Sequence, residues 1–254
     1  MTISVTLADA NILISRTLRD YFVYAAKLGA LDIHWSDGIL DETTRNLIDK
    51  FDFSQEDADV LVDRLSAFIP TALVEVKKHD ETRVAKVEMD AKDRHVLAAA
   101  LSANAELLLT QNVRHFPRDW MAKRGIELVD AGTLLMRLAV DYPDILREAH
   151  RLGVNSRQQT EEQVFEILVD QIGVEATAVV RAVVTAGPQS GDEAGFSWSP
   201  RPEGGYADSP AFDPHADARK AIRTGFEAAQ ALIHGTRISL DDVTTTVRAN
   251  RERL

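Results

Sequence analysis

Five short runs rich in β-branched residues and leucine alternate with longer helical patterns, and no other feature restricts the fold of this chain as strongly. The runs are Ile3 to Ala8, Ile33 to Trp35, Leu73 to Val76, Glu106 to Thr110 and Ile126 to Val129. Strands that alternate with helices form βαβ units, which place the strands in a parallel sheet with right-handed crossovers. The sequence therefore predicts an α/β fold for residues 1–137.

Apolar residues recur at helical spacing between these runs. One helix is predicted over Ile12 to Ala26, and a second is expected to follow an N-cap at Ser54 and to end at Pro70. A third opens at Asp93 with an alanine-rich stripe. These helices supply the crossovers of the sheet. The aromatic residues expected to serve in the core or in packing are Phe22, Trp35, Phe53 and Phe68.

Beyond the α/β unit the pattern becomes helical and then changes composition. The segment Thr160 to Gln163 has the spacing of a capping box, and residues 138–186 are predicted to form a helical extension. Five of the eight prolines lie between Gly187 and His215, which predicts a flexible linker over 187–215. Residues 216–254 carry two amphipathic patterns and are predicted to form a helical tail.

Composition excludes several classes of protein. The 254 residues include 29 basic and 40 acidic side chains, a formal net charge of −11, so the chain is not one that coats nucleic acid or anionic lipid non-specifically. The absence of cysteine excludes disulfides and thiolate metal sites. No apolar stretch is long enough to span a bilayer, and the first residues lack a signal-peptide pattern. We therefore expect a cytoplasmic protein with no membrane association.

Polar side chains follow the predicted strands or open the predicted helices. Asp9 follows the first strand, Asp90 and Asp93 precede the alanine-rich helix, and Asn112 follows the strand that ends at Thr110. The carboxyl ends of parallel strands meet at one edge of the sheet, where open α/β proteins bind ligands. Crowded carboxylates repel one another unless a divalent cation such as Mg²⁺ or Mn²⁺ lies between them. This convergence favours a cation site.

Each of these residues also has a purely structural interpretation. Asp9 and Asp93 are good helix N-caps, and Asn112 fits an Asx turn after a strand. Glu42, with Arg45 one turn later, fits a surface ion pair. Taken one at a time, these interpretations compete with a functional one.

Four motifs in order carry a resemblance to a known family. They are Asp9-x-Asn11, then Trp35-Ser36 to Glu42 with Arg45-Asn46-Leu47, then Asp90-x-x-Asp93-Arg94-His95-Val96-Leu97, then Thr110-x-Asn112 with Phe116-Pro117. Together they resemble PIN-domain ribonucleases, and most closely the VapC toxins of bacterial toxin–antitoxin modules, in a longer subgroup with a helical extension. The resemblance is strong over roughly residues 1–137 and weak over 138–185.

The resemblance implies a five-stranded parallel sheet flanked by helices and an acidic pocket that binds Mg²⁺ or Mn²⁺. Asp9, Glu42 and Asp93 match the core carboxylates of the family, and Asp90 matches an acidic position common in the subgroup. Asn112 stands where many members have a fourth acid, so one charge is missing and a second ion is expected to bind weakly. Asn112 is counted with the three core carboxylates as catalytic. Residues expected to contact substrate are Asn11, Arg45, Arg94, His95, Thr110 and Arg114, together with Lys92, although each charged one also fits a solvated surface.

The function implied by the resemblance is that of a metal-dependent endoribonuclease that cleaves tRNA or rRNA until a cognate antitoxin covers its site, and that forms a homodimer. A phosphatase with Asp9 as nucleophile is disfavoured because Asn11 stands where such enzymes have a second aspartate. The alternative kept open is a non-catalytic RNA-binding or complex-forming module of the same fold. The basic residues of the tail, such as Arg219 and Arg223, leave three roles for it: restraint of the nuclease in cis, dimerisation or stability, or contact with RNA.

Overall fold

A computed structural model describes residues 4–156 and 159–186 of the chain. Its elements are β1 (Ser4–Ala8), α1 (Ala10–Ile14), α2 (Arg16–Lys27), β2 (Leu31–His34), α3 (Asp37–Phe51), α4 (Gln55–Phe68), α5 (Lys78–Val84), η1 (Ala91–Asp93), α6 (Arg94–Ser102), β3 (Leu107–Leu109), η2 (Val113–His115), α7 (Arg118–Ala122), β4 (Glu127–Val129), α8 (Ala131–Asp141), α9 (Pro143–Asn155) and α10 (Glu161–Thr185). The predicted linker and tail, and the three roles considered for the tail, lie outside the described residues.

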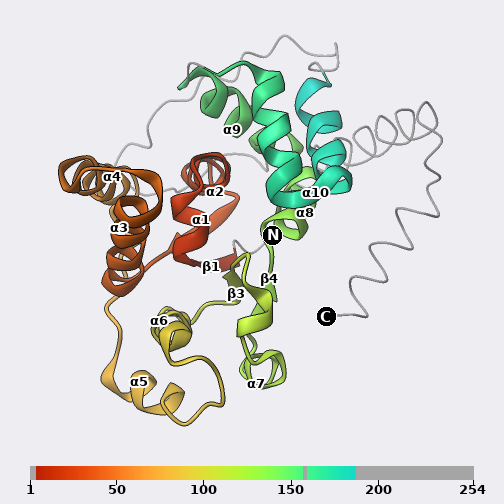
Figure 1. Cartoon of the computed structure of the whole chain (residues 1–254). Coiled ribbons are helices and arrows are strands. Elements are labelled where there is room, and N and C mark those ends of the chain that lie inside the picture. The colour runs from red at the N-terminus through yellow and green to blue at the C-terminus, as the bar shows by residue number, and fades with distance from the viewer. Residues whose placement is uncertain (1–3, 157–158, 187–254) are drawn as a thin grey trace, which may run out of the picture.

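The strands form one parallel sheet in the order β2-β1-β3-β4 (Figure 1). Leu7 of β1 is in register with His34 of β2 and with Leu108 of β3, and Leu108 is in register with Leu128 of β4. Helices connect successive strands along the chain. The α/β prediction is therefore confirmed. Where the structure describes them, the ends of the four strands lie within two residues of the predicted ends.

The predicted fifth strand, Leu73 to Val76, is wrong as a strand, because it shortens to a single parallel bridge between Trp35 and Leu73. The N–H of Trp35 donates to the carbonyl of Ala72 at 3.0 Å, and the N–H of Val74 donates to the carbonyl of Trp35 at 2.8 Å. Both backbone groups of Trp35 are used, and the next residue, Ser36, already caps α3. No residue after Trp35 is therefore available to extend the pairing with residues 73–76, so the sheet has four strands.

The single helix predicted over Ile12 to Ala26 is also wrong, because Ser15 divides it into α1 and α2. The Ser15 hydroxyl accepts a hydrogen bond from the N–H of Leu18 at 3.2 Å and caps α2. Serine favours an N-cap over a helix interior, and here this local preference outweighs the continuous apolar pattern. Two other signals are confirmed: Ser54 caps α4, and Thr160 with Gln163 forms the capping box of α10.

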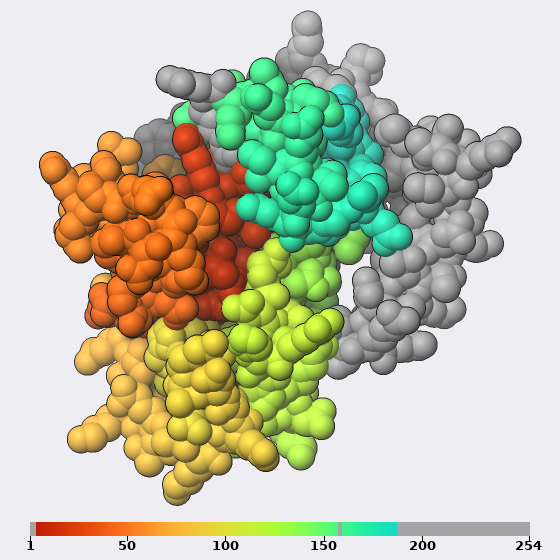
Figure 2. Space-filling model, viewed as in Figure 1, coloured from red at the N-terminus to blue at the C-terminus, as the bar shows by residue number. Residues whose placement is uncertain are grey.

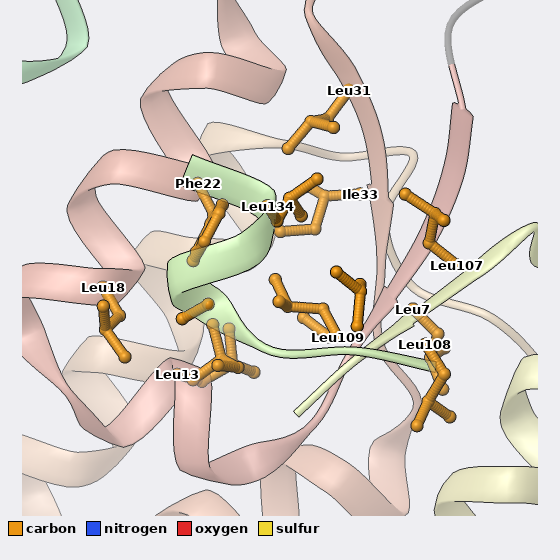
Figure 3. Close-up of a cluster of buried hydrophobic side chains, with 14 of the residues drawn as sticks. Leu7, Leu13, Leu18, Phe22, Leu31, Ile33, Leu107, Leu108, Leu109 and Leu134 are labelled. Carbon is orange, nitrogen blue, oxygen red and sulfur yellow. The ribbon is translucent and has the colours of Figure 1, made fainter. Parts of the chain in front are cut away.

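Apolar side chains cover both faces of the sheet, as expected for a parallel sheet that lies between helices. Leu7 and Leu108 are fully buried, and Figure 3 shows them beside Leu109, with Leu13 and Phe22 of the helices among the same cluster. The same core continues into α9 and α10, where the buried residues are Leu146, Phe165, Leu168, Val180 and Val183. The boundary expected at residue 137 falls inside α8, which packs against both helices.

No helix within residues 4–156 or 159–186 combines the length and the apolarity needed to cross a membrane.

Candidate active site

Asp9 stands at the carboxyl end of β1, and hydrogen bonds hold its carboxylate from three directions. Its Oδ1 accepts from the backbone N–H of Ala10 at 2.7 Å, which caps α1. Its Oδ2 accepts from the side-chain amide of Asn11 and from the hydroxyl of Thr110, each at 2.6 Å. Asp9 is only 5% exposed. It is therefore both the helix cap that one interpretation expected and a fixed, buried carboxylate.

Glu42 on α3 and Asp93 at the end of η1 lie close enough to Asp9 for their charges to act on it. Burial raises the pKa of Asp9 above its ordinary value, while hydrogen bonds from Thr110 and Ala10 oppose the rise. The charges of Glu42 and Asp93 raise the pKa of Asp9 further. Because charges act on a titration only over short distances, the structure brings the three carboxylates to one edge of the sheet.

Glu42 and Asp93 each pair with a histidine. The Oε2 atom of Glu42 lies 3.1 Å from Nε2 of His95, and the bond from His95 lowers the pKa of Glu42, while Glu42 raises the pKa of His95. The Oδ2 atom of Asp93 lies 3.0 Å from Nδ1 of His115. Asp93 occupies the N-cap position of α6, as expected, but its side chain makes no capping hydrogen bond. Arg45, the expected ion-pair partner of Glu42, instead donates to the carbonyl of Asp41.

The same pairs explain why no metal cluster is present in the described part of the chain. Within it, no group of three or more histidine, aspartate and glutamate side chains is arranged to hold a metal ion. Asp9 is bound by Thr110 and Asn11, whereas Glu42 and Asp93 are each turned to a histidine. The site consists of three carboxylates, each of which contacts a neighbouring side chain.

A groove of about 1380 Å³ lies beside these carboxylates. Its floor comes from the start of α1 and α2, and its walls come from α3 on one side and from α9 and α10 on the other. In Figure 2 the red N-terminal segment is visible as this floor, between the orange surface of α3 and α4 and the teal surface of α10. The groove is wide enough for a polymer segment to lie along it.

The predicted site residues divide into four groups. Those lining the groove are Asn11, Glu42, Lys92, Asp93 and Asn112, whereas Asp9 and Thr110 are buried beneath it. Arg45 and His95 line a neighbouring cavity of about 850 Å³ that shares Glu42 and Lys92. Asp90, Arg94 and Arg114 line neither cavity: Asp90 is exposed and caps η1, Arg94 donates to the carbonyl of Val87, and Arg114 is exposed on η2. The structure thus brings most of the predicted residues together and leaves these three outside.

Comparison with known proteins agrees with this geometry. The sequence from residue 5 to residue 114 matches the family model described as PIN domain, and this stretch carries Asp9, Glu42, Asp93 and Asn112. Residues 5–114 are thus similar to PIN domains. Over 66 residues the chain is 36% identical to VapC50 of Mycobacterium tuberculosis (strain H37Rv), a protein named as a ribonuclease. That match covers 26% of this chain and 37% of the length of VapC50, and no solved structure matches the chain.

Helix α10, outside the matched stretch, is joined by hydrogen bonds to the loop that follows β3. The helix is kinked at Gly173, where φ is 83°, and the carbonyl of Gln171 accepts from the side-chain amide of Gln111 at 2.7 Å. The backbone N–H of Gln111 donates to the side-chain oxygen of Asn11 at 3.0 Å, and Asn11 donates to Asp9. A chain of hydrogen bonds therefore leads from α10 to the buried carboxylate.

Sequence reasoning missed several residues that line the groove or contact its carboxylates. His115 gave no ligand spacing, and Gln171 lies in a helix that gave only an apolar pattern. Phe53 was expected in the core or in packing, but 39% of it is exposed and it lines the groove, while Phe22 and Trp35 are buried as expected. The one available signal was on α3, where Glu42, Asn46 and Lys50 recur every fourth residue and so share a face.

Proposed function

We propose that this protein is a metal-dependent endoribonuclease of the VapC type. The observation that carries the proposal is the meeting of Asp9, Glu42 and Asp93 at the carboxyl edge of a parallel sheet, beside an open groove. The PIN domain and the similarity to VapC50 support a nuclease role. We further propose tRNA or rRNA as the substrate, an antitoxin as the partner, a homodimer as the assembly and the cytoplasm as the location.

A divalent cation fits the chemistry of the acidic site. Three carboxylates supply the hard oxygen ligands that Mg²⁺ and Mn²⁺ prefer. Burial raises the pKa of Asp9 and the charges of Glu42 and Asp93 raise it further, so a cation bound among them would oppose this rise. Asp9, Glu42 and Asp93 are the residues that would hold the ion, whereas Asp90 lies 3.5 Å from the ammonium group of Lys92 and outside the groove. When bound, such an ion neutralises phosphate charge and activates water for attack on phosphorus.

The neighbouring side chains position the acids and the substrate. Thr110 and Asn11 donate to the same oxygen of Asp9 and fix the direction of its carboxylate. Lys92 and Asn112 line the groove and offer an ammonium group and an amide to phosphate oxygens. These contacts orient a phosphodiester beside the acids without a broad basic surface, which suits a chain with a net charge of −11.

The proposal is tested by incubating the full-length protein with tRNA and, separately, with ribosomal RNA. We expect cleavage at discrete sites in Mg²⁺ or Mn²⁺, loss of cleavage in excess EDTA, and recovery when Mn²⁺ is restored. The new 5′ ends are mapped by sequencing. Intact RNA in both cations, with protein that is folded by circular dichroism, would contradict the nuclease assignment.

Replacing Asn112 by aspartate tests the missing fourth acid. A carboxylate at this groove-lining position adds one negative charge near Asp93, so Asn112→Asp is expected to bind Mn²⁺ several-fold more tightly. Isothermal calorimetry on the two full-length proteins measures the change directly. Unchanged or weaker affinity would place Asn112 outside the ligands of the ion. Gln55→Glu, at an exposed position at the start of α4 outside the groove, adds the same charge and serves as a control for altered net charge.

One observation favours a second function, a PIN-fold module that binds RNA without cutting it. Glu42 and Asp93 each already contact a histidine, so each acid has a side-chain partner without a cation. In that case Mn²⁺ at millimolar concentration gives no binding heat, and RNA binds equally well in EDTA. Tight Mn²⁺ binding together with cleavage excludes the non-catalytic alternative.

A further inference from the structure

Two phenylalanines at the C-terminal end of α3 are exposed on the wall of the groove. Phe51 is 56% exposed and Phe53 is 39% exposed, and both line the groove together with Asn46 and Lys50. Most large apolar residues of this chain are buried in one continuous core. Solvent-exposed aromatic rings beside an acidic site indicate a binding surface, because exposing such rings to water does not stabilise the fold.

The backbone that carries these rings is held firmly. Asp52, between them, adopts a left-handed conformation with φ of 55° and ends α3. The N–H of Phe53 donates to the carbonyl of Leu47 at 3.3 Å, and the hydroxyl of Ser54 accepts from the N–H of Asp57 at 3.0 Å to start α4. The turn between the two helices is thus closed by hydrogen bonds on both sides. The backbone from which the rings project is therefore fixed before any ligand binds.

The face of α3 between the acids and the rings is polar and partly basic. Glu42, Asn46 and Lys50 are spaced four residues apart on this face, and Phe51 follows directly. At a rise of about 1.5 Å per residue, the backbone at Phe51 lies roughly 13 Å along the helix from that at Glu42. The charge of Lys50 lowers the pKa of Glu42, and Lys50 has no ion-pair partner among the described residues. An ammonium group therefore stands between the acids and the rings.

We propose that Phe51 and Phe53 form a stacking platform for an unpaired base of the RNA, held a few nucleotides away from the phosphate at the acids. This inference rests on the proposed function and deepens it by naming the side chains that would contact a base of the substrate RNA. Stacking on a side chain requires a base that is free of its own helix. Lys50 contacts the intervening phosphate, and the rings take the base, which is the combination found in single-strand binding grooves.

A protein partner is the competing occupant, and the chemistry of the groove favours RNA. An apolar helix would need a broad apolar face, yet Leu47 is only 2% exposed, and the other groove-lining neighbours of the rings on α3 are the Asn46 amide and the Lys50 ammonium group. Asn112 and Lys92 continue the same polar lining toward Asp93. Ammonium and amide groups around exposed rings suit a phosphate chain with bases better than an apolar surface.

The test uses fluorescence of 2-aminopurine, a base analogue that is quenched when it stacks. Short unstructured RNAs carrying 2-aminopurine at successive positions are titrated with full-length protein in an Asp93→Asn background, which keeps the RNA intact. We expect quenching at one or two positions. In Phe51→Ala or Phe53→Ala the dissociation constant is expected to be about ten-fold higher. Val140→Ala, which changes an equally exposed apolar side chain on α8, is the matched control.

Conservative variants separate stacking from apolar contact. Phe51→Tyr is expected to retain quenching, whereas Phe51→Leu keeps an apolar side chain but loses the flat ring, and is expected to lose quenching and affinity. If Phe51→Leu quenches and binds like the parent, or if no position is quenched, the stacking platform is refuted. Equal RNA affinity in all variants, with loss of binding to an apolar partner helix, would assign the rings to a protein interface. Failure of the nuclease proposal shows separately, as quenching without cleavage in protein that retains Asp93.

Discussion

Asp93→Asn is expected to lower the rate of RNA cleavage at least about 100-fold while leaving the fold intact. A 100-fold loss corresponds to roughly 2.7 kcal/mol of activation free energy, a modest share of what a metal site contributes to phosphodiester cleavage. The substitution removes one of three negative charges that face each other at the sheet edge. It is nearly isosteric, so the surrounding packing is preserved.

The structure explains why stability should hardly change. Asp93 gives no capping bond to α6, and its side chain contacts His115, whose ring an asparagine oxygen can still contact. We expect the melting temperature of Asp93→Asn to stay within a few degrees of the parent, and its Mn²⁺ affinity to fall. Cleavage at the parental rate would remove Asp93 from the catalytic site.

Asp90→Asn provides the matched comparison three residues earlier in the chain. Asp90 is exposed, caps η1 and lies beside Lys92 rather than in the groove. Its replacement changes net charge by the same amount as Asp93→Asn. Cleavage should fall far less, because the lost charge is not among the facing carboxylates. An equal loss in both variants would indicate a general charge effect instead of a specific site.

The acids of the site were predictable because local signals and topology agreed on them. Asp9 follows a strand of strongly β-forming residues, and Asp93 opens an alanine-rich helix, so the parallel arrangement alone brings them to one edge. Glu42 was different: its helical pattern equally fits a surface ion pair, and only the family resemblance selected it. Its approach to Asp9 depends on how α3 packs against α1, which no local pattern records.

The partners of the acids were beyond sequence reasoning. His115 and Asp93 are separated by 22 positions, and Asn11 and Gln111 by 100, so these contacts are set by tertiary packing. The exposure of Phe53 was missed for another reason. An aromatic residue is most often buried, and its exposure here follows from the left-handed turn at Asp52. The break of the first predicted helix at Ser15, in contrast, had a local signal in a residue that favours caps.

Trp35→Ala is expected to lower the free energy of unfolding by about 3 to 5 kcal/mol, the usual cost of emptying a large buried site. Trp35 is fully buried at the end of β2, and its backbone forms both hydrogen bonds of the only bridge to residues 72–74. The loss is measured by urea denaturation followed by circular dichroism. A change below about 1 kcal/mol would mean that the indole is not part of the core.

Trp35→Phe isolates the contribution of volume from that of the indole N–H. The Nε1 atom of Trp35 is buried and has no hydrogen-bond acceptor among the described residues. Removing an unpaired donor offsets part of the volume lost, so Trp35→Phe should cost only about 1 kcal/mol. Trp35 also precedes Ser36, whose hydroxyl caps the helix that carries Glu42. At temperatures well below the melting transition, cleavage of RNA should therefore decline in Trp35→Ala but persist in Trp35→Phe. An equal loss of cleavage in both variants would show that the indole N–H itself is needed.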